Sequence, residues 1–226
     1  EKSKDLVRMA VNRASLLEPI PAVSGEIDKS ALVIGGGISG MTAAISLADQ
    51  GFPATIVEKA SELGGAAKDL KQTSKGQDVQ GYLAALVDKV KQHPDVEVLT
   101  GSEGGGASGF VGNFETQVAN GNGTKTVQHG VTIIATGGKA ADVDEYLYGQ
   151  NPRVTRWHDL EHDPEKIKNA DSIVFIQCVG SRDDNRPYCS RICCTASVLQ
   201  AVSIKEQHPD TDVFILYRDI RTYGEK

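Results

Sequence analysis

The feature that most constrains this chain is a glycine loop between a buried strand and a helix. Residues 35–40 read Gly-Gly-Gly-Ile-Ser-Gly, which satisfies the pattern G-x-G-x-x-G. The apolar run Ala31–Ile34 before the loop is typical of a strand buried on both faces of a parallel sheet. A helix rich in Ala, Ile and Leu is expected directly after the loop, over Met41–Asp49. This order predicts the Rossmann arrangement, which binds a dinucleotide.

Each glycine of the pattern has its own physical reason. Gly35 permits the tight turn, Gly37 lets a pyrophosphate approach the backbone, and Gly40 lets the helix pack closely on the strand. The helix entry at Ile38 and Ser39 then offers free N–H groups and the positive end of the helix dipole to phosphates.

A second short strand, Ala54–Glu58, completes a β-α-β unit. Glu58, at its end, is placed to accept hydrogen bonds from the hydroxyls of an adenosine ribose, and it argues against a 2′-phosphate there. The alternative is a purely structural glycine turn with a surface glutamate. The loop by itself does not choose between FAD and NAD, because both use it.

The rest of the chain divides into recognisable segments. We expect a lead-in helix and linker over 1–28, a dinucleotide-binding domain over 29–141, a polar connector over 142–170 and a partial second Rossmann-like domain over 171–226. The glycine-rich stretch 101–123 predicts antiparallel hairpins, that is, a β-meander inserted into the first domain. The second β-α-β pattern comprises strands Ser172–Ile176 and Val213–Tyr217 and a helix from about Cys194 to Gln207.

All four cysteines fall between the first strand and the helix of that second unit, where another glycine loop is expected. They are Cys178, Cys189, Cys193 and Cys194. Four thiolates can ligate a tetrahedral zinc ion or a 4Fe–4S cluster. A cluster with four thiolate ligands is negatively charged, so the helix N-terminus and the nearby Arg182, Arg186 and Arg191 favour it. Alternatively, Cys178 is a small buried residue of the strand end.

Charge and composition limit the classes of partner that this chain can bind. The formal charge is −6, with acidic and basic residues interleaved, so the chain offers no basic stripe for nucleic acid. The sequence contains neither an apolar run long enough to cross a membrane nor a signal peptide, so a cytoplasmic location without membrane insertion is expected. Because the sequence starts without Met and stops shortly after a strand, we interpret it as a fragment of a longer protein.

Residues Glu58–Gly65, following the glycine loop, resemble the FAD-binding half of two-dinucleotide-binding-domain flavoproteins. The resemblance implies FAD rather than NAD, and it implies cofactor contacts from the second glycine pair and from the late Ala135-Thr136-Gly137 element. Beyond the glycine loop and Glu58, the residues so assigned are Lys59, Gly64, Gly65, Ala66, Thr136 and Gly137. The expected fold is therefore α/β: a Rossmann-like FAD-binding domain with an inserted β-meander, plus part of a second Rossmann-like domain.

Three segments, Ile176–Asp183, Tyr188–Cys194 and Tyr217–Gly224, closely resemble the A subunit of heterodisulfide reductase. Gly76–Leu83 and Glu145–Gly149 resemble it too. The resemblance implies an oxidoreductase subunit that carries FAD and a 4Fe–4S cluster and passes electrons among partner subunits, in some members by bifurcation. It also implies that the family's N-terminal cysteine-containing region, the rest of the second domain and the ferredoxin-like clusters are not part of this chain.

Other interpretations stay open at this point. One is a dithiol disulfide reductase resembling thioredoxin reductase, which the loss of the second glycine loop disfavours because that loop would hold NADPH. Another is the flavoprotein subunit of a quinone-interacting oxidoreductase complex, which shares these motifs. A third is a non-enzymatic subunit whose cofactors mainly scaffold partners. The sequence also leaves a homodimer open, and it suggests no catalytic acid or base.

Overall fold

The computed structural model describes residues 1–20, 25–73, 76–121 and 123–222 of the 226-residue chain. Its main sheet has four parallel strands in the order β3-β2-β1-β7, as a Rossmann unit requires. The strands are β1 (Ala31–Ile34), β2 (Ala54–Val57), β3 (Val96–Leu99) and β7 (Val131–Ile134). The fold expected for the first half of the chain is therefore confirmed.

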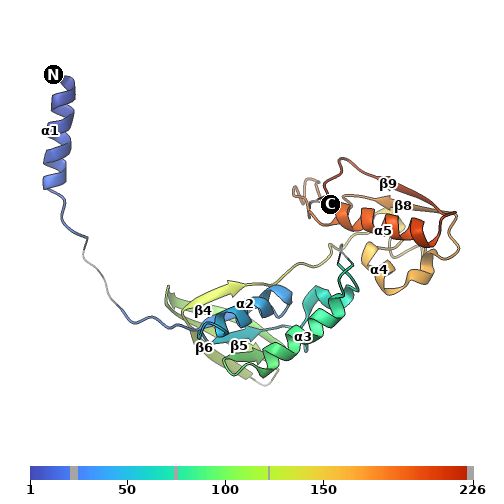
Figure 1. Ribbon diagram of the computed structural model, residues 1–226, viewed down its shortest axis with the longest axis horizontal. Helices are drawn as coiled ribbons and strands as arrows, with labels where there is room; N and C mark the ends of the chain where they lie inside the picture. The colour runs from blue at the N-terminus through green and yellow to red at the C-terminus, as the bar shows by residue number, and fades with distance from the viewer. Residues whose placement is uncertain (21–24, 74–75, 122, 223–226) are drawn as a thin grey trace.

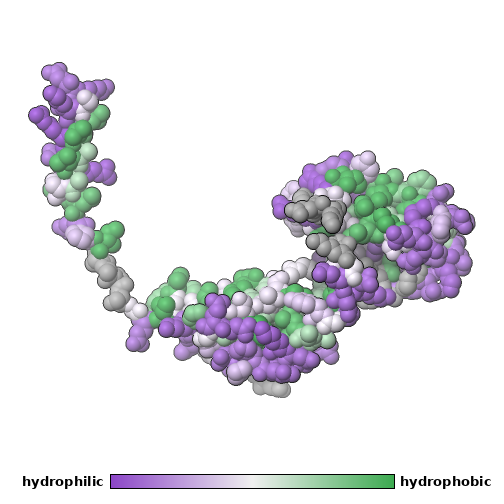
Figure 2. Space-filling model, viewed as in Figure 1, coloured by the Kyte–Doolittle hydropathy of each residue, from purple (hydrophilic) through white to green (hydrophobic). Residues whose placement is uncertain are grey.

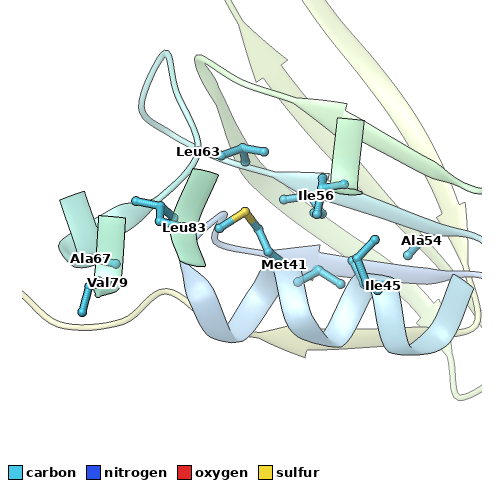
Figure 3. Packing of buried hydrophobic residues seen from close by; sticks show 11 residues of the cluster. Met41, Ile45, Ala54, Ile56, Leu63, Ala67, Val79 and Leu83 are labelled. Atoms are coloured by element: carbon cyan, nitrogen blue, oxygen red, sulfur yellow. The ribbon is translucent and has the colours of Figure 1, made fainter. Parts of the chain in front are cut away.

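Helices α2 (Ile38–Ala48) and α3 (Val79–Gln92) pack on one face of this sheet. Figure 3 shows Met41 and Ile45 of α2 facing Ile56 of β2, in a cluster that Leu83 of α3 joins. Helix α2 begins at Ile38, earlier than the expected Met41, because the end of the glycine loop already forms its first turn. Helix α3 begins after Asp78, whose side chain accepts a hydrogen bond from the N–H of Gln80 and so caps the helix.

The opposite face of the sheet is covered by the meander of β4 (Ser102–Phe110), β5 (Asn113–Asn120) and β6 (Gly123–His129). Leu32 of β1 and Val57 of β2 pack there against Val118 and Val127. Successive strand residues point to opposite faces, so the short all-apolar strands supply both this layer and the helical layer. The antiparallel pairing of β4, β5 and β6 confirms the predicted hairpins.

One buried histidine ties the meander to the parallel sheet. His129 is 1% exposed, its Nε2 lies 2.9 Å from Thr116 Oγ1, and its Nδ1 lies 3.2 Å from the carbonyl oxygen of Val131. Its ring stacks on Phe114. Burial lowers the pKa of His129, so the imidazole is held neutral.

The second unit contains the parallel pair β8 (Ser172–Ile176) and β9 (Asp212–Leu216), connected by α5 (Cys193–Gln207). This β-α-β arrangement confirms the expected partial Rossmann-like domain, and the helix begins at Cys193, one position before the expected start. Helix α4 (Trp157–His162) and the short 3₁₀ turns η2 (Glu145–Leu147) and η3 (Pro164–Ile167) lie in the connector. A further 3₁₀ turn, η1 (Gly65–Asp69), follows β2.

Helix α1 (Lys2–Ser15) stands apart from both units in Figure 1. It buries none of its residues, and apolar side chains are visible along it in Figure 2. Within the part of the chain that the structure describes, every helix is too short or too polar to cross a membrane.

Candidate functional site

Two of the loop glycines are required by the fold itself. Gly35 has φ +111°, and a Cβ atom on it would lie 2.2 Å from the carbonyl oxygen of Ala135. A Cβ atom on Gly40 would lie 1.9 Å from the carbonyl oxygen of Gly35. Side chains cannot be accommodated at either distance, so these two glycines serve the turn and the helix packing, as the sequence predicted.

Gly37 is different, because nothing in the protein requires a glycine there. Its φ of −78° is accessible to any residue, and a Cβ atom on it would meet only the Cα of Gly65, at 4.0 Å. It is the N-cap residue of α2, so the open space beside it lies at a helix N-terminus. Such an end presents unpaired N–H groups and positive potential, which suit a phosphate.

The second glycine pair forms the wall of this space. The N–H of Gly64 donates a 2.8 Å hydrogen bond to the carbonyl oxygen of Gly36, and Gly64 pairs with Gly37 as an isolated bridge. A Cβ atom on Gly65 would lie 3.1 Å from the Cα of Gly37. The structure thus brings Gly64 and Gly65 against the glycine loop, and their contact with the cofactor stays a prediction.

Glu58 also lies at the loop. Its Oε2 accepts a 2.6 Å hydrogen bond from the N–H of Gly36, and its Oε1 accepts a 2.7 Å hydrogen bond from the N–H of Ala60. These bonds fix the carboxylate at the carboxyl end of β2, beside the glycine loop. That is the position at which an acidic side chain contacts a ribose in Rossmann domains.

The other residues predicted to contact the cofactor lie around the glycine loop, and most of them are exposed. The N–H of Ala135 bonds to the carbonyl oxygen of Ile34, which sets the exposed Thr136 and Gly137 just beyond the glycine loop. Ser39 and Ala66 are exposed, and Ile38 is half-buried against the core. Lys59 is exposed and forms a 2.8 Å ion pair with Glu103, which raises the pKa of the lysine.

The predicted metal ligands all lie at one end of the second unit. Cys178 follows β8, Cys193 opens α5, Cys194 is buried in the first turn of that helix, and Cys189 lies in the loop between them. All four are free thiols. Among the residues that the structure describes, no three Cys, His, Asp or Glu side chains are arranged to share one metal ion.

N–H donors nevertheless lie beside two of these thiols. Arg182 Nη1 lies 3.9 Å from Cys178 Sγ, and the backbone N–H of Arg191 donates a 3.4 Å hydrogen bond to Cys189 Sγ. The donor set of four thiols with N–H groups directed at sulfur is the chemistry that an iron–sulfur cluster requires. Cys178, Arg182 and Arg191 all adopt left-handed backbone conformations, with φ of +64°, +59° and +64°. Such conformations are uncommon for these residue types and concentrate at functional sites.

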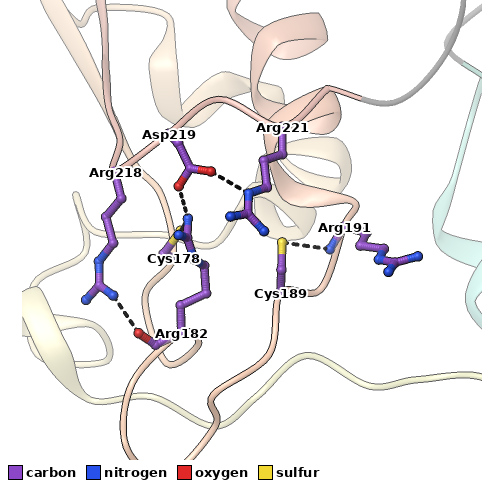
Figure 4. A network of polar contacts seen from close by, with 7 residues as sticks. All are labelled: Cys178, Arg182, Cys189, Arg191, Arg218, Asp219 and Arg221. Atoms are coloured by element: carbon purple, nitrogen blue, oxygen red, sulfur yellow. Dashed lines mark hydrogen bonds and ion pairs between the residues drawn. The ribbon is translucent and has the colours of Figure 1, made fainter.

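Sequence reasoning missed three members of this site. Figure 4 shows Arg218, Asp219 and Arg221, which follow β9, beside the cysteine loop. The cysteine loop is defined as residues 177–194, from the end of β8 to the first turn of α5. Asp219 forms ion pairs with Arg182 and Arg221, and these lower the pKa of Asp219. In the sequence, the segment Tyr217–Gly224 carries only a family resemblance; the parallel pairing of β8 and β9 is what brings it to the cysteines.

The chain is similar to several known proteins. Residues 33–100 match the family described as the NAD(P)-binding Rossmann-like domain. The chain is 31% identical to the A subunit of the H(2):CoB-CoM heterodisulfide,ferredoxin reductase of Methanothermobacter marburgensis, over 100% of this chain and 49% of that protein. It is 30% identical to the first iron-sulfur A subunit of the CoB–CoM heterodisulfide reductase of Methanopyrus kandleri, again over 100% of this chain and 49% of that protein.

The chain thus spans about half the length of these curated relatives. The first alignment extends over 321 positions, more than the 226 residues of this chain, so the aligned half of that relative includes segments with no counterpart here. Among solved structures, L-proline dehydrogenase from P. horikoshii aligns with a TM-score of 0.49 and 18% identity, over 92% of this chain and 39% of that one.

Proposed function

Because this chain is homologous to the A subunit of heterodisulfide reductase along its whole length, we propose that it is an FAD-dependent oxidoreductase segment that relays electrons within a multi-subunit complex. FAD would be held in the first Rossmann unit, and one 4Fe–4S cluster would be held by the cysteine loop of the second. The proposal rests on one observation above all: Gly37 borders open space that the protein does not fill, at the N-terminus of α2.

The residues of the first unit have distinct tasks in this proposal. The free N–H groups of the first turn of α2 would bind the pyrophosphate, and Gly37, Gly64 and Gly65 would leave room for it. Glu58 would exchange its bonds to loop amides for the ribose hydroxyls. Thr136 and Gly137 would flank the cofactor from the end of β7. Bound FAD would supply one- and two-electron chemistry, while the protein sets its position and potential.

In the second unit, Cys178, Cys189, Cys193 and Cys194 would ligate the cluster. The thiols come from a strand end, a loop and a helix entry of one β-α-β unit, and binding the cluster would draw them together from the separate positions they have among the described residues. Arg182 and the N–H of Arg191 are already directed at two of the sulfur atoms, where they would offset the negative charge of a thiolate-ligated cluster. The partners are proposed to be other redox subunits, since the relatives are named as subunits.

The experiment that tests this function is a cofactor inventory on anaerobically purified protein. Incubation with FAD or with NAD⁺, followed by desalting, should leave about one FAD and no NAD⁺ per chain. Reconstitution with iron and sulfide should then give about four irons per chain and a paramagnetic signal on reduction. Retention of NAD⁺ instead of FAD would overturn the flavin assignment, and a disulfide among the cysteines without any iron would favour the dithiol hypothesis.

A further inference from the structure

The segment after β9 reaches back over the cysteine loop. Because β8 and β9 are parallel, their carboxyl ends lie at the same edge of the small sheet, and each is followed by a functional loop. Asp219 in the second loop forms ion pairs with the side chains of Arg182 and Arg221 (Figure 4). Arg218 adds a hydrogen bond from its guanidinium to the backbone carbonyl of Arg182.

Both arginines that pair with Asp219 face the cysteine loop, and Arg182 contacts a thiol there. The guanidinium of Arg182 reaches Cys178 Sγ at 3.9 Å, and its side chain is only 22% exposed. Figure 4 shows the guanidinium of Arg221 directed toward Cys189. Two guanidinium groups this close repel each other, and the carboxylate between them offsets that repulsion. Asp219 is thus the acidic partner that the two guanidinium groups share.

We propose that Asp219 is a positioning residue for the cysteine loop, holding Arg182 and Arg221 beside the sulfur atoms of Cys178 and Cys189. This inference rests on the proposed function, because its redox consequence requires the cluster. Reduction adds negative charge to a thiolate-ligated cluster, so nearby cationic N–H donors stabilise the reduced form and raise the midpoint potential. Asp219 would thus set the potential through the two arginines, without itself touching the cluster.

The sign of one measurement separates this role from a simple charge effect. Asp219→Asn removes a negative charge, which by direct electrostatics raises the midpoint potential of a nearby cluster. If Asp219 acts by holding two guanidiniums, the same substitution releases them to solvent and lowers the potential instead. We therefore expect a lower midpoint potential in Asp219→Asn, measured by a redox titration followed by electron paramagnetic resonance. A potential that is unchanged or higher would overturn the proposal.

Asp210→Asn is the matched control, because it makes the same charge change on the same unit. Asp210 is exposed and precedes β9, so it lies at the opposite end of the strand from Asp219. The midpoint potential of the cluster in Asp210→Asn should equal that in the parent protein. Asp219→Glu keeps the carboxylate, so its midpoint potential should stay close to that of the parent. Arg182→Gln should lower the midpoint potential as Asp219→Asn does.

If the protein takes up no iron, the proposed cluster is contradicted, but the positioning role of Asp219 can still be tested by a second measurement. In cluster-free protein, hydrogen exchange over residues 179–191 should be several-fold faster in Asp219→Asn than in Asp210→Asn, because the Arg182 anchor is lost. Equal exchange in the two variants would show that Asp219 does not position this loop.

Discussion

Gly37→Val separates the requirements of a ligand from those of the fold. Valine adds three carbon atoms to the open space beside the N-terminus of α2, where the nearest protein atom to a Cβ is 4.0 Å away. The free protein should tolerate this, because φ at Gly37 is an ordinary −78°. The expected loss of stability is about 1 kcal/mol, from the poorer helix N-cap, which corresponds to a fall of roughly 2–4 °C in Tm for a chain of this size.

Flavin binding should respond far more strongly than stability. A pyrophosphate kept away from the helix N-terminus loses hydrogen bonds from backbone N–H groups to a charged acceptor, each worth about 1.5–3 kcal/mol. Losing two of them weakens binding by about 3–6 kcal/mol, or roughly 10²–10⁴-fold in Kd. Fluorescence titration with FAD measures this directly, and a thermal melt of the cofactor-free variant measures the stability.

Two further glycines calibrate the result. Gly106→Val, on exposed β4 where a Cβ meets nothing within 4 Å, should alter neither FAD affinity nor folding. Gly40→Ala should destabilise the cofactor-free protein severely, since its Cβ would lie 1.9 Å from a carbonyl oxygen. A folded Gly37→Val protein that binds FAD as tightly as the parent would refute the reasoning.

Three other outcomes are expected. Burial lowers the pKa of His129 in the folded protein, whereas in the unfolded chain the pKa is about 6.5. At a pH below about 6.5 the unfolded chain therefore binds more protons, and the free energy of unfolding should fall as the pH decreases. Urea midpoints measured from pH 7.5 to 5.5 should show this fall in the parent and much less of it in His129→Gln. Cys178→Ala should lower iron occupancy in the reconstituted protein, and full occupancy would show that the half-buried Cys178 is not a ligand. NADH should not bind the second unit, and titration of a Gly37→Val protein, whose first site is blocked, would reveal any such binding.

Much of the first unit could be predicted because its signals are local. The glycine loop and the apolar strands each specify structure within a few residues, and the parallel sheet follows from their order. The start of α2 at Ile38 was missed because helix periodicity begins only where apolar residues recur, while the backbone turns helical as soon as the loop ends at Gly37. Helix boundaries depend on caps more than on periodicity.

The contacts of the cysteine loop, by contrast, could not be predicted from local signals. Its cysteines could be proposed as ligands from their clustering in the sequence, yet the proposed role of Asp219 depends on a contact across the β8–β9 pair that no local pattern encodes. An ion pair between Asp219 and Arg182 requires that two loops meet, and only the parallel register provides this. Charged residues in a loop after a strand are common, so the sequence offered no reason to prefer Asp219 over Asp210.

The two β-α-β units differ at the same structural point. In the first unit the strand ends in Gly35, whose φ of +111° begins the turn toward the phosphate site. In the second unit the counterpart of Gly35 is Gln177, whose N–H bonds to the carbonyl oxygen of Leu216 as that of Gly35 bonds to Val57, and the chain turns left-handed one residue later, at Cys178 with φ +64°. The second unit therefore lacks the glycine that begins the turn of the first, and its left-handed residue carries a thiol, which suits the proposed cluster better than a dinucleotide.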